Sequence, residues 1–330
     1  MTAVKPGGFI PVVHAATNIR PDEIDTLVAA EAVSGALATL GFATEIVAVD
    51  LNRRDLEALQ RRHPLLIFNL VDAVRGDGRL APVIPSLMDA LGLRYTGAHS
   101  DAWLKTLSKV ATKLKLQSEG LPTPEFSVDG SGLDPEAPVI VKAAWEHGSL
   151  GLDESSVVKG AKAGHTIKER NSRYRTEHFA EAYVEGREFN LALLEGTRGA
   201  VVLPIAEILF EGWREGTPRI VGYDAKWTPE SEAYTGTPRR FGLEQDEPKL
   251  AARLTELALS CWTLFGLAGY ARVDFRVDAK GEPWILEVNV NPCLSPDAGF
   301  AAAARQAGLS YAGLIGRIVE AVPRALQAIA

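Results

Sequence analysis

Apolar and polar positions alternate with two different periods along the first hundred residues. Short apolar runs at 8–15, 44–51 and 65–70 are typical of strands, whereas 21–40 and 53–62 show helical spacing. A further helix is expected over 80–91. Pro21 and the two acids that follow it fit a helix start, because a first turn lacks N–H partners and favours negative charge. This order of elements predicts an α/β domain with a parallel sheet.

The rest of the chain predicts two further units. The first has a helix over 106–120, which ends at Gly120 with Pro122 beyond it, a strand over 137–145 and a strand at 181–184. The second has strands at 187–196 and 200–210, a polar loop over 211–240, a helix over 248–267 and C-terminal helices. We therefore expect three domains, at 1–98, 99–184 and 185–330.

Two strands near the C-terminus, at 271–278 and 284–291, carry the most informative polar pattern. Side chains in a strand alternate between faces, so Glu287 and Asn289 point away from their apolar neighbours. The turn formers between the strands predict a hairpin centred between residues 280 and 281. That register places Asp274 opposite Glu287, and Arg272 opposite Asn289.

Two carboxylates that face each other across a sheet repel, so this register favours a cation between Asp274 and Glu287. Hard oxygen ligands without His or Cys favour magnesium or manganese over zinc. A solvated sheet face would show the same alternation, and on the pattern alone that interpretation stays open. Arg272 beside the acids and the turn at Pro292 favour the metal site.

Glycines and lysines mark a second candidate region. Lys142 ends an apolar strand, where a buried ammonium needs an anionic partner. The following loop holds Ser149 between glycines, which let backbone N–H groups approach a phosphate, although many surface turns look alike. The loop lacks the P-loop arrangement of lysine and hydroxyl. Lys109 and Lys226, taken alone, are better interpreted as solubilising surface lysines.

The overall composition limits the classes of partner that the protein is expected to bind. The chain has 330 residues, 46% of them hydrophobic, and a formal net charge of −7, which disfavours nucleic acid and anionic membranes as partners. It shows no signal peptide and no apolar stretch of membrane-spanning length. Two cysteines, Cys261 and Cys293, match neither a disulfide framework nor a zinc spacing, which suits a reducing cytoplasm.

Taken together and in order, these segments resemble the ATP-grasp superfamily and, within it, the D-alanine:D-alanine ligase family. The similarity covers most of the chain. It rests on the segments FNL and GDG within 68–78, LGLRYTG at 91–97, LSKVATKLKLQSEGLPTP at 107–124, PVIVKAAWEHGSLG at 138–151, EAYVEGREFNLALL at 181–194, LPIAEI at 203–208, YDAKW at 223–227, and RVDF with ILEVNVNP. The resemblance implies a three-domain ATP-grasp architecture of mixed α/β class with an N-terminal parallel α/β domain.

The resemblance also implies a role for each candidate residue. Lys109 and Lys142 would contact the phosphates of ATP, Ser149 and its loop would cover them, and Lys226 would reach them from a second loop. Around the adenine and the ribose it implies a set of four residues, Glu181, Tyr183, Val184 and Glu188.

For the metal and the reaction, Asp274, Glu287 and Asn289 would hold two magnesium ions, with manganese as an alternative. Arg272 would stabilise the oxyanion of a tetrahedral intermediate. The implied reaction joins a small-molecule carboxylate to an amine: the carboxylate attacks the γ-phosphorus of ATP, and the amine displaces phosphate from the acyl phosphate. The resemblance implies a homodimer as well.

The substrate side departs from the family. The glutamate expected after the first strand to bind a substrate ammonium is not evident, with Asp22 or Glu23 as substitutes. The family's tyrosine and serine in the closing loops are replaced by Trp227 and Gly148. Further on, Cys293 stands where the family has glycine, and fits a small filler better than a nucleophile. The expected carboxylate-binding serine of the second substrate falls near Ala298.

Three functions follow from this comparison. The leading hypothesis is a carboxylate–amine ligase that acts on an amino acid other than D-alanine. A genuine D-alanine:D-alanine ligase with an unusual pocket is the second. A nucleotide-binding regulatory protein without turnover is the third, and Arg272 argues against it, because a mere binder needs no group that stabilises an oxyanion.

Overall fold

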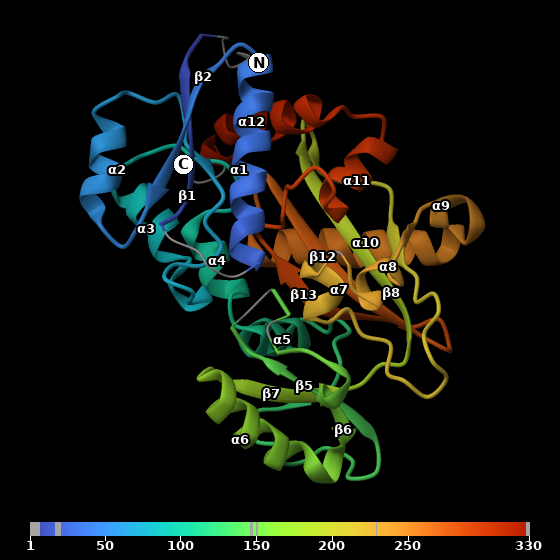
Figure 1. Ribbon diagram of the computed structural model, residues 1–330. Coiled ribbons are helices and arrows are strands. Elements are labelled where there is room, and N and C mark those ends of the chain that lie inside the picture. The colour runs from blue at the N-terminus through green and yellow to red at the C-terminus, as the bar shows by residue number, and fades with distance from the viewer. Residues whose placement is uncertain (1–6, 17–20, 146–147, 150, 229, 328–330) are drawn as a thin grey trace.

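The computed structural model describes residues 7–16, 21–145, 148–149, 151–228 and 230–327, and its elements form three sheets (Figure 1). The first sheet has the order β2-β1-β3, and all its pairings are parallel, as the sequence predicts. Its strands are β1 (Phe9–Ala15), β2 (Ala43–Val49) and β3 (Phe68–Asn69), and the helices of this region are α1 (Pro21–Thr39), α2 (Arg53–Gln60), η1 (Gly78–Leu80) and α3 (Val83–Ala90).

The second sheet is antiparallel, with the order β4-β7-β5-β6, and α6 packs on it (Figure 1). Two helices, α4 (Ser100–Thr106) and α5 (Lys109–Ser118), lead into it. Its elements are β4 (Phe126–Ser127), β5 (Pro138–Ala143), η2 (Glu154–Ser156), β6 (Val157–Lys159), η3 (Gly160–Lys162), α6 (Ala163–Tyr174) and β7 (His178–Ala182). The strand expected at 181–184 therefore starts and ends earlier than predicted.

The third sheet is the largest and has the order β11-β10-β8-β12-β13, with β9 also paired to β8. Its strands are β8 (Gly186–Gly196), β9 (Gly199–Val202), β10 (Ala206–Ile208), β11 (Arg239–Arg240), β12 (Tyr270–Asp278) and β13 (Pro283–Asn289). The helices of this part are α7 (Tyr223–Trp227), α8 (Glu232–Thr235), α9 (Leu243–Asp246), α10 (Pro248–Phe265), α11 (Gly299–Gln306) and α12 (Tyr311–Gln327).

Two predictions in this region were wrong. The single strand expected over 200–210 is split into β9 and β10 around Pro204, which has no N–H to donate to a ladder. The polar loop expected over 211–240 contains α7, α8 and β11. In α8 the Ser231 side chain accepts from the N–H of Tyr234, so a local cap starts a helix within a polar segment.

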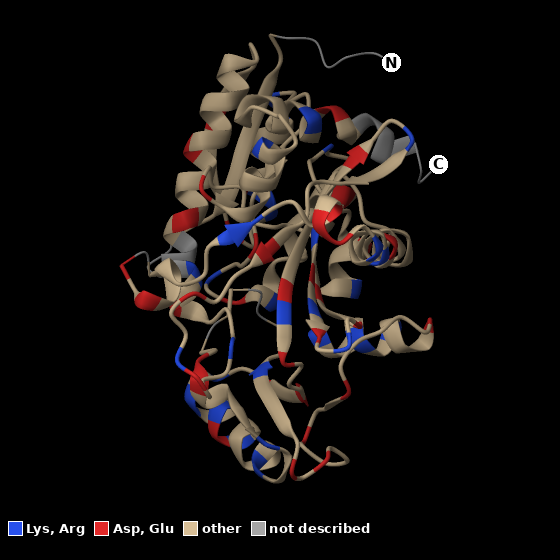
Figure 2. Ribbon diagram, turned by 90° about the vertical axis from the view of Figure 1, so that its right-hand side faces the viewer, with Lys and Arg blue, Asp and Glu red and all other residues tan. Residues whose placement is uncertain are grey.

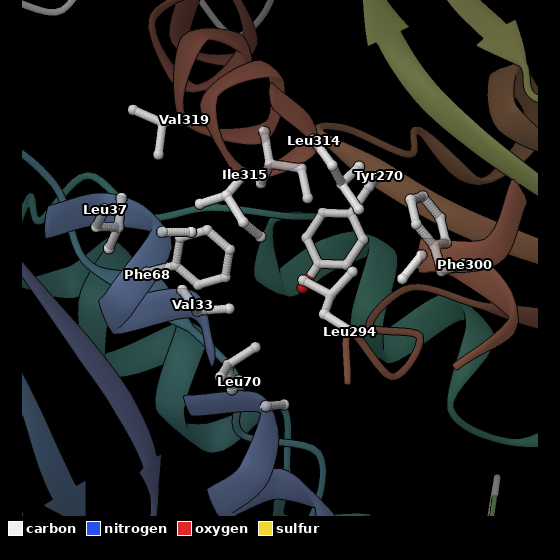
Figure 3. Packing of buried hydrophobic residues seen from close by; sticks show 14 of the residues in the cluster. Val33, Leu37, Phe68, Leu70, Tyr270, Leu294, Phe300, Leu314, Ile315 and Val319 are labelled. Carbon is white, nitrogen blue, oxygen red and sulfur yellow. The ribbon is translucent and has the colours of Figure 1, made fainter. Parts of the chain in front are cut away.

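A continuous apolar core joins the first and the last parts of the chain (Figure 3). Val33 of α1 and Phe68 of β3 belong to the same cluster as Ile315 of α12 and Tyr270 of β12. Figure 1 shows α1 and α12 side by side, and the two helices are in contact. Through Tyr270 this packing joins β12, the strand that carries Arg272 and Asp274, to the N-terminal sheet. The domain boundaries at 98/99 and 184/185 stay a prediction.

Acidic and basic positions are interspersed along the ribbon in Figure 2. Within the described residues, no helix is both long and apolar enough to cross a membrane.

Candidate active site

The hairpin of β12 and β13 has the predicted register. Arg272 pairs with Asn289, and Asp274 pairs with Glu287. The register then shifts by a bulge between Asp274 and Phe275. Because residues that face each other across antiparallel strands share a side of the sheet, all four polar side chains lie on one face.

Protein cations lie beside both opposed carboxylates. Arg272 forms a forked ion pair with Asp274, with Nε–Oδ1 at 2.7 Å and Nη2–Oδ2 at 2.8 Å. Lys109 Nζ lies 3.2 Å from Glu287 Oε2, and Asn190 Nδ2 donates to Asp274 at 2.9 Å. These side chains place positive charge beside the two carboxylates, and the divalent cation expected between Asp274 and Glu287 stays a prediction.

The charges at this site are poorly solvated. Burial raises the pKa of Asp274, with Glu287 adding to the effect and Arg272 opposing it. Burial lowers the pKa of Lys226, against the attraction of Glu287. Burial also disfavours the charge of Arg272, but the attraction of Asp274 outweighs it and the pKa of Arg272 is raised. Charged ligands interact more strongly in such a place than in water.

The oxygen donors on this face suit a magnesium ion. Asp274 and Glu287 offer carboxylates, and Asn289 offers an amide oxygen that also accepts from the N–H of Asn291 at 2.9 Å. In the described part of the chain no group of three or more His, Cys, Asp or Glu could hold a metal by itself. Magnesium keeps several waters and binds through one or two carboxylates together with substrate phosphates, so this donor set fits it.

A first cavity gathers all the predicted site residues except Arg272 and Asn289. It encloses about 800 Å³ of empty space that opens to solvent. Its walls include the apolar side chains of Ile140, Leu152 and Ile220. The predicted residues on it are Lys109, Lys142, Ser149, Glu181, Tyr183, Val184, Glu188, Lys226, Asp274 and Glu287. Apolar walls at one part and cations at another fit a nucleobase and phosphates.

Glu181 is the carboxylate partner that the sequence requires for Lys142. It is buried, its Oε2 lies 2.6 Å from Lys113 Nζ, and it also forms an ion pair with Lys142. Lys113 is fully buried and donates to Thr123 Oγ1 at 2.8 Å. Burial lowers the pKa of Lys113 to about 8, against the attraction of Glu181. Lys113 was not predicted, although its spacing of four from Lys109 on α5 places both on one helix face.

Glu188 also has a partner that the sequence did not reveal. Arg276 Nη2 lies 2.7 Å from Glu188 Oε2 and its Nε lies 3.0 Å from the same oxygen. Arg276 follows Asp274 by two positions, so strand alternation places it on the same face. At the same end of the cavity the Tyr183 hydroxyl accepts from the N–H of Arg219 at 2.8 Å.

The glycine loop reaches the first cavity through Ser149, whose Oγ donates to the carbonyl of Val221 at 3.2 Å. Ser149 has a positive φ of 60°, a conformation that favours glycine. Its neighbours at 146, 147 and 150 lie outside the described residues, as do the side chains of Asp22, Glu23 and Trp227.

A second cavity lies next to the first and shares Glu188, Val221, Lys226 and Asp274 with it. It encloses about 1490 Å³ of empty space, and Arg272 and Asn289 line it. The sequence did not predict most of its other polar residues, which come from α1, from the loops after β3 and β13, and from β11: Asp25, Asp72, Arg239, Asn291 and Asp297. Ala298 and Gly148, both noted as departures from the family, also line it.

Cys293 lines the second cavity as a neutral thiol. Its Sγ donates to Asp25 Oδ2 at 2.8 Å. Burial, with a smaller contribution from Asp25, raises the pKa of Cys293 to about 12. The thiolate is the nucleophilic form of cysteine, so this environment favours the small filler over the nucleophile.

The D-ala D-ala ligase C-terminus family model matches residues 134–320, more than half of the chain. The chain belongs to the D-alanine–D-alanine ligase family. The D-alanine--D-alanine ligase of Moorella thermoacetica is 32% identical over 314 residues, which are 89% of this chain and 93% of that protein. An uncharacterized protein y4sG of Sinorhizobium fredii is 32% identical over 263 residues, 78% of this chain and 75% of that protein.

Solved structures of the D-alanine–D-alanine ligase family share the fold. The crystal structure of the Bacillus anthracis ligase complexed with ATP has a TM-score of 0.77 at 19% identity and covers 98% of this chain and 100% of that one. The ligase from Coxiella burnetii has a TM-score of 0.70 at 15% identity, with 97% of each chain covered. The expected mixed α/β ATP-grasp fold is confirmed. Family membership also confirms the expected enzyme class, an ATP-dependent ligase.

Proposed function

We propose that the protein joins a carboxylate to an amine through an acyl phosphate, with at least one substrate other than D-alanine. The observation that carries the proposal is that Lys226 and Asp274 line both cavities. ATP in the first cavity and a small acid in the second would meet at these residues. A shared wall of this kind suits transfer of a phosphoryl group from one ligand to the other.

The nucleotide side of the proposal assigns the first cavity to ATP. Lys109 and Lys142 would hold the phosphates, with Ser149 covering them. Tyr183 and Val184 would lie along the adenine, and Glu188 near the ribose. The ion pairs of Glu181 with two lysines support a role in placing Lys142 rather than a direct contact with the base.

In the metal-binding part, Asp274, Glu287 and Asn289 would hold magnesium, with two ions as the expected number. Bound magnesium neutralises phosphate charge that would otherwise repel the attacking carboxylate. Lys226 would orient the phosphate that is transferred. Arg272, held by its forked ion pair with Asp274, would donate to the oxyanion when the amine adds to the acyl phosphate. The reaction needs no covalent enzyme nucleophile, which agrees with the protonated state of Cys293.

A substrate other than D-alanine is supported by the second cavity. There the carboxylate of Asp25 accepts a hydrogen bond from the thiol of Cys293, and Ala298 offers no hydroxyl to a substrate carboxylate. The named relatives favour the alternative, a genuine D-alanine–D-alanine ligase, since the Moorella thermoacetica protein carries that name. A homodimer and a cytoplasmic location stay predictions from the sequence.

Phosphate release tests the proposal. The enzyme is incubated with ATP, magnesium and pairs from a panel of D- and L-amino acids and small carboxylic acids, and the products are identified by mass spectrometry. Turnover with another pair at least tenfold above D-alanine alone is the expected result. Preferred turnover of D-alanine would establish the alternative. No phosphate release with any pair, from a protein that binds ATP, would contradict a ligase.

A further inference from the structure

The second cavity contains a guanidinium that is not needed for the chemistry derived above. Arg239 and Arg240 form the short edge strand β11, and neighbouring residues of a strand point to opposite faces. Arg240 Nη2 lies 2.6 Å from Glu207 Oε2 and is thereby neutralised. Arg239 lines the second cavity instead.

Arg239 is held in place without a carboxylate. Its Nη1 donates to the backbone carbonyl of Asp297 at 3.1 Å. A Cβ at Gly299, the first residue of α11, would lie 3.2 Å from the Arg239 Nε, so glycine gives the guanidinium room over that helix start. Among the described residues, Arg239 takes part in no ion pair with a nitrogen–oxygen distance of 4.0 Å or less. The Asp297 carboxylate attracts it only from beyond that distance.

The two arginines of the second cavity differ in charge balance. Arg272 is paired with Asp274 through two hydrogen bonds, whereas Arg239 forms no ion pair within 4.0 Å among the residues that the structure describes. Burial and the nearby Arg272 charge lower the pKa of Arg239 from its usual range, which still leaves it cationic at neutral pH. Arg239 is exposed to solvent where it lines the cavity, so its guanidinium is accessible to an anion that enters.

We propose that Arg239 binds the carboxylate of the amine substrate, so that the acceptor is an amino acid with a free carboxylate. This inference rests on the proposed function of the two cavities. The acid to be phosphorylated must reach Lys226 and Asp274, which face the first cavity as well. Arg239 lines the second cavity and not the first, so the acceptor is the substrate that it would meet.

A guanidinium matches this task because it presents two parallel N–H donors to a carboxylate. Ala298, which caps α11, has no side-chain hydroxyl, so an acceptor carboxylate at this helix start would receive no hydrogen bond from that side chain, and Arg239 is the cation beside it. Arg239 is therefore a specificity-determining residue in this enzyme, one that distinguishes an acid from an uncharged acceptor.

The test compares Arg239→Ala, Arg239→Lys and the neighbouring Arg240→Ala by steady-state kinetics. The acceptors are the best amine substrate of the amino-acid panel and its primary amide. We expect Arg239→Ala to raise the acceptor KM roughly tenfold to hundredfold, the size expected for lost charge-assisted hydrogen bonds, and to remove most of the preference for acid over amide. The KM for ATP should change less than about twofold. Arg239→Lys should be intermediate, because it keeps the charge but not the fork.

Arg240→Ala is the matched control and should leave the acceptor KM unchanged. An active enzyme whose acceptor KM and acid preference survive Arg239→Ala overturns the inference while the proposed function stands. If no pair turns over, the proposed function fails, and calorimetry of the same amino acids and amides with the protein saturated with a non-hydrolysable ATP analogue and magnesium decides about Arg239. If the amino acid binds only when it has a carboxylate and the protein has Arg239, the inference is supported. If binding does not depend on both, or no binding is found, the inference is overturned.

Discussion

The two cavities of this enzyme differ in how their residues are brought together. The charged residues of the first lie on regular strands and helices, such as Lys142 on β5 and Lys109 on α5. The second draws on separate parts of the chain, including Asp25 on α1 and Asp297 in the loop before α11. ATP chemistry demands fixed cations and oxygens, whereas substrate choice depends on loops and edges that can differ between family members.

The strongest test of this comparison changes a residue on the wall that both cavities share. Asp274→Asn keeps the size of the side chain but removes the charge that would bind magnesium and pairs with Arg272. We expect kcat to fall by about 10³-fold or more, as for other losses of transition-state electrostatics. Phosphate release measures the effect, and an unchanged melting temperature would show that the fold is intact. Activity within tenfold of the wild type would contradict a shared reaction centre.

A second test addresses the buried charges behind the first cavity. Glu181→Gln leaves Lys113 and Lys142 without a carboxylate, and we expect it to lower the free energy of unfolding by about 3 kcal/mol, as for one broken partner of a buried ion pair. Urea denaturation measures the loss.

Glu119→Gln is the matched control, since it removes the exposed i,i+4 partner of Lys115 and should cost less than about 0.5 kcal/mol. Equal losses in the two variants would show that the buried network does not organise the first cavity.

The pH dependence of stability gives a further test of the buried charges behind the first cavity. The pKa of Lys113 is lowered from 10.5 to about 8 in the folded protein, so the unfolded chain binds more protons between these values. The free energy of unfolding attributable to Lys113 should therefore rise with pH from about 8 to 10.5, by at most about 3 kcal/mol.

Urea titrations of the wild type and Lys113→Met across this range isolate this contribution, since other titrating groups are common to both proteins. If the free energies of unfolding of the two proteins change with pH in parallel, burial does not disfavour the ammonium of Lys113.

The smallest effect is expected at Cys293 in the second cavity. Its thiol is neutral and serves as a donor to Asp25, so Cys293→Ala should change kcat by less than about threefold. Iodoacetamide labelling at pH 8 should be slow at this residue, because its pKa is about 12. A loss of more than about 10³-fold in Cys293→Ala, with rapid labelling of the wild type, would identify a nucleophile.

The sequence predicted the register of the β12–β13 hairpin correctly, because residues close together in the chain determine that register. The turn formers from Asp278 to Pro283 set the register, and strand alternation then places Asp274 and Glu287 together. The split of the strand at Pro204 could also have been predicted, because proline interrupts a ladder.

The rest depends on contacts between distant parts of the chain. Lys113 became significant only when its contact with Glu181, on another strand, was known. Asp25 and Cys293 are 268 positions apart, and no local pattern reports their hydrogen bond. Arg239 looked like one of two basic residues in a polar loop until the pairing of β11 with β10 separated its face from that of Arg240.

The packing of α1 on α12 has a consequence for synthesis of the protein. The helix that carries Asp25 shares its core with Leu314, Ile315 and Ile318, which a ribosome adds well after the last strand of the second sheet. A nascent chain can complete the second sheet, whose strands end at residue 182, long before the first helix has its partner. The side of the second cavity that Asp25 lines thus gains its helix packing only after the second sheet can form.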